Sequence, residues 1–239
     1  MRNIMLLISL FCLNVTAQNV CVPLIQKNFA MPDTLFETFR AMSLTFTPPV
    51  DDFDSNTGGQ NFYNLPHLYR LHGTMYALES KDSEFFCCVF AKFIDNDAVM
   101  TRCEAKTNVA HDIIVTKRFP TQQSANPSLI KDISPFVSYY SPEKAKEIFN
   151  ADTVICYSID MYGLNLSMNN RRNKLFNYSE NKVLLLQKND RGFIALYCFY
   201  TKKGQKKLKK YMRLIENTFW FIDYCPTGSD EIKIVPVIR

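Results

Sequence analysis

The sequence FFCCVFAKFI, residues 85–94, is the segment that decides the fold. Lys92 is its only charged residue, and its apolar side chains occupy both faces that an extended chain presents. Its length is typical of a strand, and a strand that is apolar on both faces needs a packed layer on each of them. The segment therefore predicts a central strand that is covered from above and from below.

Two further strands are predicted directly after this segment. Residues 99–105 carry Val, Thr, Cys and Ala at alternate positions, so we expect a hairpin across the turn at 95–97 that places Val89 opposite Cys103. Cys88 would then point away from Cys103, and no disulfide between them is expected. Residues 111–119 alternate in a similar way and predict another strand.

A second hairpin is predicted in the C-terminal half. The apolar runs 182–188 and 193–201 flank a short polar turn that ends at Gly192, a residue that can adopt the positive φ of a bulged turn. Helices are predicted at 31–42, 142–150 with Ser141 as its cap, and 204–217. The remaining predicted strands are 67–78, 153–159, 218–224 and 231–238, and the predicted polar loops are 47–64 and 163–181.

The order of these elements predicts an α+β fold. Strands come in runs and helices do not alternate regularly with them, which argues against a doubly wound or barrel fold. We expect an antiparallel or mixed β-sheet with about three helices packed on it. Residues 18–239 are interpreted as one domain, with a polar stretch at 121–128 as the candidate for an internal boundary.

The N-terminal 17 residues have the pattern of a cleavable signal peptide. A short basic start precedes a ten-residue apolar run at 4–13, and small residues stand at Val15 and Ala17. The run is too short for a membrane span, which needs about 20 residues. We expect a secreted or periplasmic protein that is not an integral membrane protein. A cut between Ala17 and Gln18 favours a bacterial source.

The cysteines do not predict a disulfide framework. The chain has eight, and removal of Cys12 with the signal would leave seven, an odd number. Most lie inside apolar runs, where cysteine behaves as a small hydrophobic residue. A bridge between Cys21 and Cys225 is left open.

Positive charge is concentrated on the predicted helix at 204–217. Residues 202–217 hold seven Lys or Arg and one Glu, whereas the whole chain has a formal net charge of only +5. The candidate partner-binding residues are Lys206, Lys207, Lys209, Lys210 and Arg213. Such a patch suits an acidic protein, an acidic glycan or an anionic lipid surface. Nucleic acid is not expected for an exported chain, and a merely solvated helix face is the alternative.

Metal and cofactor signals are weak. Asp52, Asp54 and Asn56 supply oxygen atoms at alternate positions, as a calcium-binding loop does. An EF-hand would continue with Gly at 57 and an acid at 63, but the chain has Thr57 and Tyr63. No cofactor is predicted.

The sequence therefore favours a non-catalytic binding domain. No GxSxG, GxGxxG or Walker pattern is present. One alternative is an exported hydrolase that pairs a cysteine with His111 or His67. Another is a structural or assembly protein of the cell envelope that uses exposed strand edges as contacts.

Overall fold

The centre of the structure is an antiparallel pair of nine-residue strands, β4 (Phe85–Phe93) and β8 (Gly192–Tyr200). The computed structural model describes residues 33–56, 75–118, 132–159 and 178–223. All of β8 is buried, and so are the first seven residues of β4. The prediction of a central strand covered on both faces is confirmed, because each face packs into its own apolar cluster.

The main sheet is antiparallel throughout and has seven strands in the order β2-β3-β4-β8-β7-β6-β5. Strands from both sides of the 121–128 stretch contribute to it. A second, two-stranded antiparallel sheet pairs β1 with β9. The other strands are β1 (Leu44–Phe46), β2 (Phe53–Asn56), β3 (Met75–Ser80), β5 (Ser138–Tyr139), β6 (Thr153–Tyr157), β7 (Glu180–Lys188) and β9 (Phe219–Phe221).

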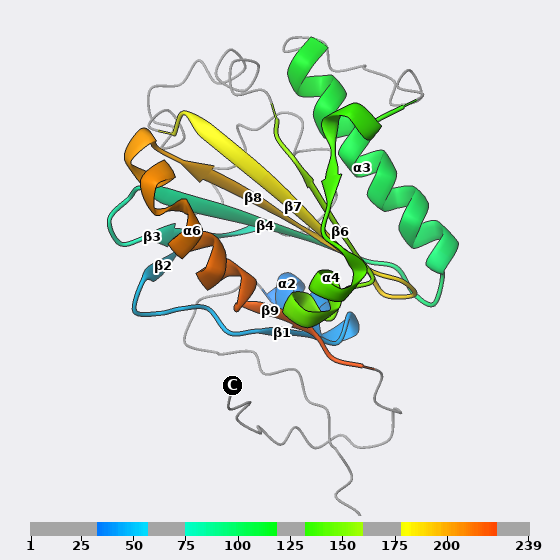
Figure 1. Cartoon of the computed structure of the whole chain (residues 1–239). Coiled ribbons are helices and arrows are strands. Elements are labelled where there is room, and N and C mark those ends of the chain that lie inside the picture. The colour runs from blue at the N-terminus through cyan, green and yellow to red at the C-terminus, as the bar shows by residue number, and fades with distance from the viewer. Residues whose placement is uncertain (1–32, 57–74, 119–131, 160–177, 224–239) are drawn as a thin grey trace, which may run out of the picture.

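Helices cover both faces of the large sheet, as Figure 1 shows. One face packs against α3 (Ala98–Arg118), which lies over β7 and β8. The other face packs against α2 (Asp33–Ala41), α4 (Pro142–Phe149), α6 (Lys202–Glu216) and the β1–β9 sheet. A short 3-10 helix, Ser134–Phe136, precedes β5. The α+β class and the packing of helices on an antiparallel sheet are as predicted.

Local sequence signals placed the second hairpin and two helices correctly. The β7–β8 pair turns through Gly192, whose φ is +111°. Ser141 caps α4 by accepting a hydrogen bond from the Lys144 amide, and Asn150 ends it in a left-handed conformation. The predicted helix at 204–217 is α6, which buries Tyr211, Met212 and Ile215 against the sheet.

The predicted strands at 99–105 and 111–119 are wrong, because both segments belong to α3. Asp97 caps this helix by accepting a hydrogen bond from the Met100 amide at 2.7 Å. The buried stripe of α3 follows helical spacing, but half of its residues are polar, so they give no apolar helical pattern. The alternation of Val99, Cys103 and their neighbours therefore indicated a strand instead. The stripe consists of Thr101, Ala105, Asn108, Val109, Asp112 and Ile113.

The predicted polar loop at 47–64 is also wrong in part. Residues 53–56 form β2, an edge strand that pairs with β3 and buries Phe53. Its sequence, FDSN, is made mostly of turn-forming residues, and only pairing with a neighbour makes it a strand. Several of the sequence-based predictions concern residues that the structure does not describe. They are the signal peptide at 1–17, Cys21, His67, residues 121–128, Cys225 and residues 231–238.

Candidate functional site

The basic helix α6 is fixed on the sheet by its apolar side and by its first turn. The Tyr211 ring stacks on Phe85 of β4 with 4.9 Å between ring centroids. Thr201 caps the helix, since its hydroxyl accepts a hydrogen bond from the Gly204 amide at 2.9 Å. Gly204 is buried against the Glu84 carbonyl, where any side chain would clash. These contacts hold the opposite side of the helix in solvent.

One row of lysines on α6 is neutralised by acids from the neighbouring strands and turns. Lys207 Nζ lies 2.8 Å from Asp82 Oδ2, and Lys210 Nζ lies 2.7 Å from Asp52 Oδ1. Lys203 Nζ lies 3.9 Å from Glu84 Oε1. These pairs are partly exposed, so each contributes about 1 kcal/mol or less to stability. Their main consequence is that this row presents little net charge.

Asp82 is the centre of this paired row. The Tyr211 hydroxyl donates to its Oδ2 at 2.7 Å, and the Ser80 hydroxyl donates to its Oδ1 at 2.7 Å. Burial alone would raise the pKa of Asp82, but the hydrogen bonds from Lys207, Tyr211 and Ser80 together hold it well below its ordinary value. The carboxylate stays charged and keeps Lys207 engaged.

A second row of cations on α6 faces solvent. Lys202, Lys206, Lys209 and Arg213 follow each other at spacings of four, three and four residues, which places them on one line along the helix. All four are exposed, and none has an ion-pair partner among the residues that the structure describes. The line is about 16 Å long at 1.5 Å per residue. We call these four residues the cationic stripe.

The structure thus divides the five residues predicted as partner-binding. Lys206, Lys209 and Arg213 belong to the cationic stripe, whereas Lys207 and Lys210 are held by acids. Lys202 joins the stripe although it was not among those five. The sequence located the charge on this helix, but the acids that neutralise the other row lie far away in the chain, so only the folded structure separates the two rows.

The three calcium candidates lie on β2 or directly before it. Asp52 is paired with Lys210, and Asp54 is an exposed residue of β2 in register with Glu79 of β3. Asn56 ends β2 in register with Ala77. Within the described ranges, no group of three or more His, Cys, Asp or Glu side chains could hold a metal ion.

The described cysteines offer little to the alternative of a Cys–His hydrolase. Burial raises the pKa of the Cys87, Cys88 and Cys156 thiols, which disfavours the thiolate that such catalysis needs. Cys103 is exposed, but it precedes His111 by eight residues on the same helix, a separation of about 12 Å along the axis. Cys88 and Cys103 are both free thiols.

A buried polar cluster that the sequence did not predict joins α3 to the sheet. Asp112 is fully buried, and its Oδ2 accepts hydrogen bonds from the hydroxyls of Tyr157 at 2.6 Å and Tyr197 at 2.8 Å. Asn108 Nδ2 lies 3.4 Å from both Asp112 Oδ2 and the Tyr197 hydroxyl. Burial raises the pKa of Asp112 to about 7, although the two tyrosine hydrogen bonds lower it. The cluster fixes the helix on the sheet.

An open hollow of about 620 Å³ lies beside β5, β6 and β7. Its described lining includes Ser138, Cys156, Tyr157, Asn181, Lys182 and Tyr200. These groups can donate and accept hydrogen bonds, but the described lining holds no carboxylate and no imidazole. The described part of the lining therefore does not include a histidine or a carboxylate, the commonest general bases.

No protein-family model, curated protein or solved structure matches this chain. None of the helices in the described ranges combines the length and the apolar character that crossing a membrane requires.

Proposed function

We propose that this chain is an exported, non-catalytic binding domain that contacts an acidic partner through the cationic stripe of α6. The observation that carries the proposal is the division of the α6 cations into two rows. Lys203, Lys207 and Lys210 form ion pairs with acidic residues of the same chain. The four residues of the cationic stripe are exposed to solvent and have no such partner among the described residues.

The rigidity of the helix supports a binding role. Its apolar side is in the core, so α6 cannot insert that side into a bilayer as an interfacial helix does. Contact with a partner is therefore electrostatic and made by side chains that stand on a fixed backbone. A fixed row of like charges also raises the local concentration of an oppositely charged partner and speeds its association.

The edges of the large sheet give less support to the assembly alternative. The two edge strands within the described residues are β2, with four residues, and β5, with two. Short and polar edges are a usual protection against strand addition by another chain. A surface for partners is better provided by α6 than by these edges.

Retention on an immobilised sulfated polysaccharide, a linear polyanion, tests the proposal. The stripe variant is Lys206→Gln/Lys209→Gln, and the matched control is Arg102→Gln/Lys106→Gln on α3, across the sheet. Both pairs are exposed and both variants lose two positive charges. We expect the stripe variant to elute at clearly lower salt than the wild type, and the control to elute close to it.

Equal shifts for the two variants would mean that only the net charge matters, and the proposal would be wrong. Competition with vesicles of anionic phospholipid and with polyglutamate then sorts the partner classes. The probe that removes the wild type from the column at the lowest charge concentration identifies the preferred chemistry.

A further inference from the structure

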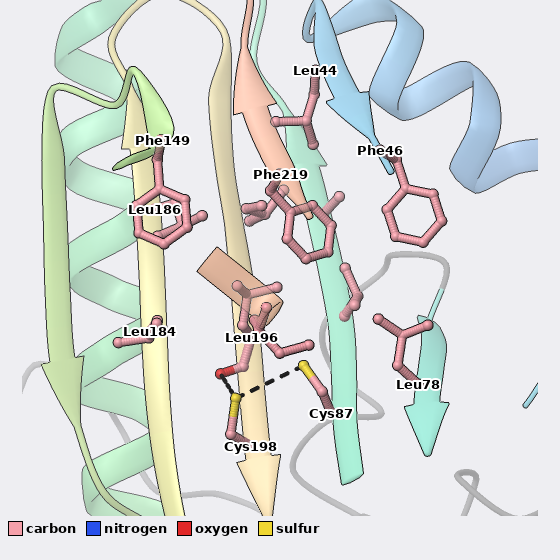
Figure 2. Close-up of a cluster of buried hydrophobic side chains, with 14 of the residues drawn as sticks. Leu44, Phe46, Leu78, Cys87, Phe149, Leu184, Leu186, Leu196, Cys198 and Phe219 are labelled. Atoms are coloured by element: carbon pink, nitrogen blue, oxygen red, sulfur yellow. Dashed lines mark hydrogen bonds between the residues drawn. The ribbon is translucent and has the colours of Figure 1, made fainter. Parts of the chain in front are cut away.

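Two cysteines face each other in the middle of the sheet. Cys87 of β4 and Cys198 of β8 are direct partners in the antiparallel register, and both are completely buried. The two sulfur atoms lie 3.8 Å apart, and the Cys198 thiol donates a hydrogen bond to Cys87 Sγ. Figure 2 shows both side chains turned toward one another inside the same apolar cluster. Cross-strand partners of this kind have the Cα separation that a disulfide needs.

The other described cysteines are not placed in this way. Cys88 follows Cys87 directly, so it points to the opposite face and packs into the cluster under α3. Cys156 points to the same face of the sheet as Cys87 and Cys198, but it lies on β6. This strand is two positions from β8, so Cys156 is about 10 Å from Cys198 and farther still from Cys87. Cys103 is on the surface of α3. Among the described thiols, Cys87 and Cys198 alone stand in cross-strand register.

We propose that Cys87 and Cys198 form a disulfide bond when the chain folds under oxidising conditions. The bond would join the two central strands of the sheet covalently. Forming it requires the sulfur atoms to approach from 3.8 Å to about 2.05 Å, which small side-chain rotations on a fixed register supply. The pairing does not depend on the binding role of α6.

The oxidant is a low-molecular-weight disulfide such as oxidised glutathione. The Cys87 thiolate attacks one sulfur of that disulfide, forms a mixed disulfide and releases one glutathione thiolate. The Cys198 thiolate then attacks the Cys87 sulfur, forms the protein disulfide and releases the second glutathione thiolate. The two protons lost by the cysteines are taken up by the two glutathione thiolates, and the two electrons reduce the oxidant.

Burial decides when this reaction occurs. Desolvation raises the pKa of Cys87 well above its ordinary value, and the neighbouring Cys198 raises it further. Both thiols are inaccessible in the folded chain. Oxidation therefore takes place while the sheet assembles, and folded reduced protein reacts slowly. The bond then encloses a loop of about 110 residues, a length at which restriction of the unfolded chain is large.

Refolding of the full chain tests the proposal. Reduced protein is unfolded and then refolded in a mixture of oxidised and reduced glutathione, and disulfide-linked peptides are mapped by mass spectrometry without reduction. We expect one dominant link between the peptides that contain Cys87 and Cys198. The link persists in Cys88→Ala and is absent in Cys87→Ala. Oxidised wild type melts about 10 °C above the reduced protein, as a typical disulfide in a chain of this size would give.

Three results would overturn the proposal. They are free Cys87 and Cys198 in correctly refolded wild type, a link that survives in Cys87→Ala because Cys88 makes it, and a melting temperature that does not depend on oxidation. The mapping of wild type and Cys88→Ala decides the question even if Cys87→Ala does not fold.

Discussion

The Tyr157 hydroxyl donates a hydrogen bond of 2.6 Å to Oδ2 of Asp112, and this contact joins β6 to α3 through a fully buried carboxyl group. The same oxygen accepts a second hydrogen bond from Tyr197 of β8. A helix that buries a carboxyl group against a sheet makes its own docking sensitive to protonation, because charging that group in the interior costs free energy.

The first prediction concerns the pH dependence of stability. The pKa of Asp112 in the folded chain is about 7, above the ordinary value of 3.8. The stability that uncharged Asp112 contributes to the fold is therefore fully present below about pH 4. It is lost progressively as the pH rises to about 7, a change of roughly 4 kcal/mol for a pKa shift of this size. Asp112→Asn cannot charge, so the difference in unfolding free energy between this variant and the wild type should be about 2–3 kcal/mol larger in favour of the variant at pH 8.5 than at pH 5.

Urea unfolding of both proteins at pH 5 and pH 8.5 measures this difference. Asp54→Asn is the control, because Asp54 is exposed and its replacement should leave the pH dependence as it is in the wild type. A stability gap between wild type and Asp112→Asn that is the same at both pH values would show that Asp112 does not titrate in this range.

The second prediction concerns the attachment of α6. A Cβ atom at position 204 would lie 2.1 Å from the Glu84 carbonyl oxygen. Glycine to alanine normally stabilises a helix by about 1 kcal/mol, but here the helix must move away from β4. Gly204→Ala should lower the free energy of unfolding by about 1–3 kcal/mol.

Thermal melting followed by circular dichroism compares this variant with Gln205→Ala, an exposed neighbour that should have little effect. If Gly204→Ala were as stable as the control, the close approach of α6 to Glu84 would be incorrect.

The third prediction concerns thiol reactivity and the hydrolase alternative. In folded, reduced protein, alkylation at pH 7 should modify Cys103 while Cys87, Cys88, Cys156 and Cys198 stay protected until the chain unfolds. Peptide mapping after short exposure to iodoacetamide identifies the sites. A cysteine that reacts faster in the folded than in the unfolded chain, and slows in His111→Ala, would support the hydrolase instead.

Much of the fold follows from local patterns. The central strand, the second hairpin and the helices α4 and α6 carry their own signals in apolar spacing, in Gly192 and in the cap Ser141. The helix α3 was missed because its buried stripe includes the polar residues Thr101, Asn108 and Asp112. Asn108 and Asp112 find their partners on β6 and β8. No apolar pattern reveals a helix that packs through such groups.

The candidate sites depend on contacts that no local pattern contains. Lys207 meets Asp82 across 125 positions of the chain, and Lys210 meets Asp52 across 158. Cys87 and Cys198 are 111 positions apart. The sequence could therefore locate the charge on α6 and the burial of the cysteines, but the division of the lysines into two rows and the facing of the two thiols required the folded structure.

The division of the α6 cations is tested most directly by two adjacent residues. Lys206 belongs to the cationic stripe, and Lys207 is held by Asp82. The affinity of Lys206→Gln and of Lys207→Gln for the same sulfated polysaccharide is compared at low salt. Lys206→Gln should bind about fivefold more weakly than the wild type, since one cation at an anionic surface contributes about 1 kcal/mol. Lys207→Gln should bind within about twofold of it, the change expected for a cation already paired. Equal losses for the two variants would contradict the stripe.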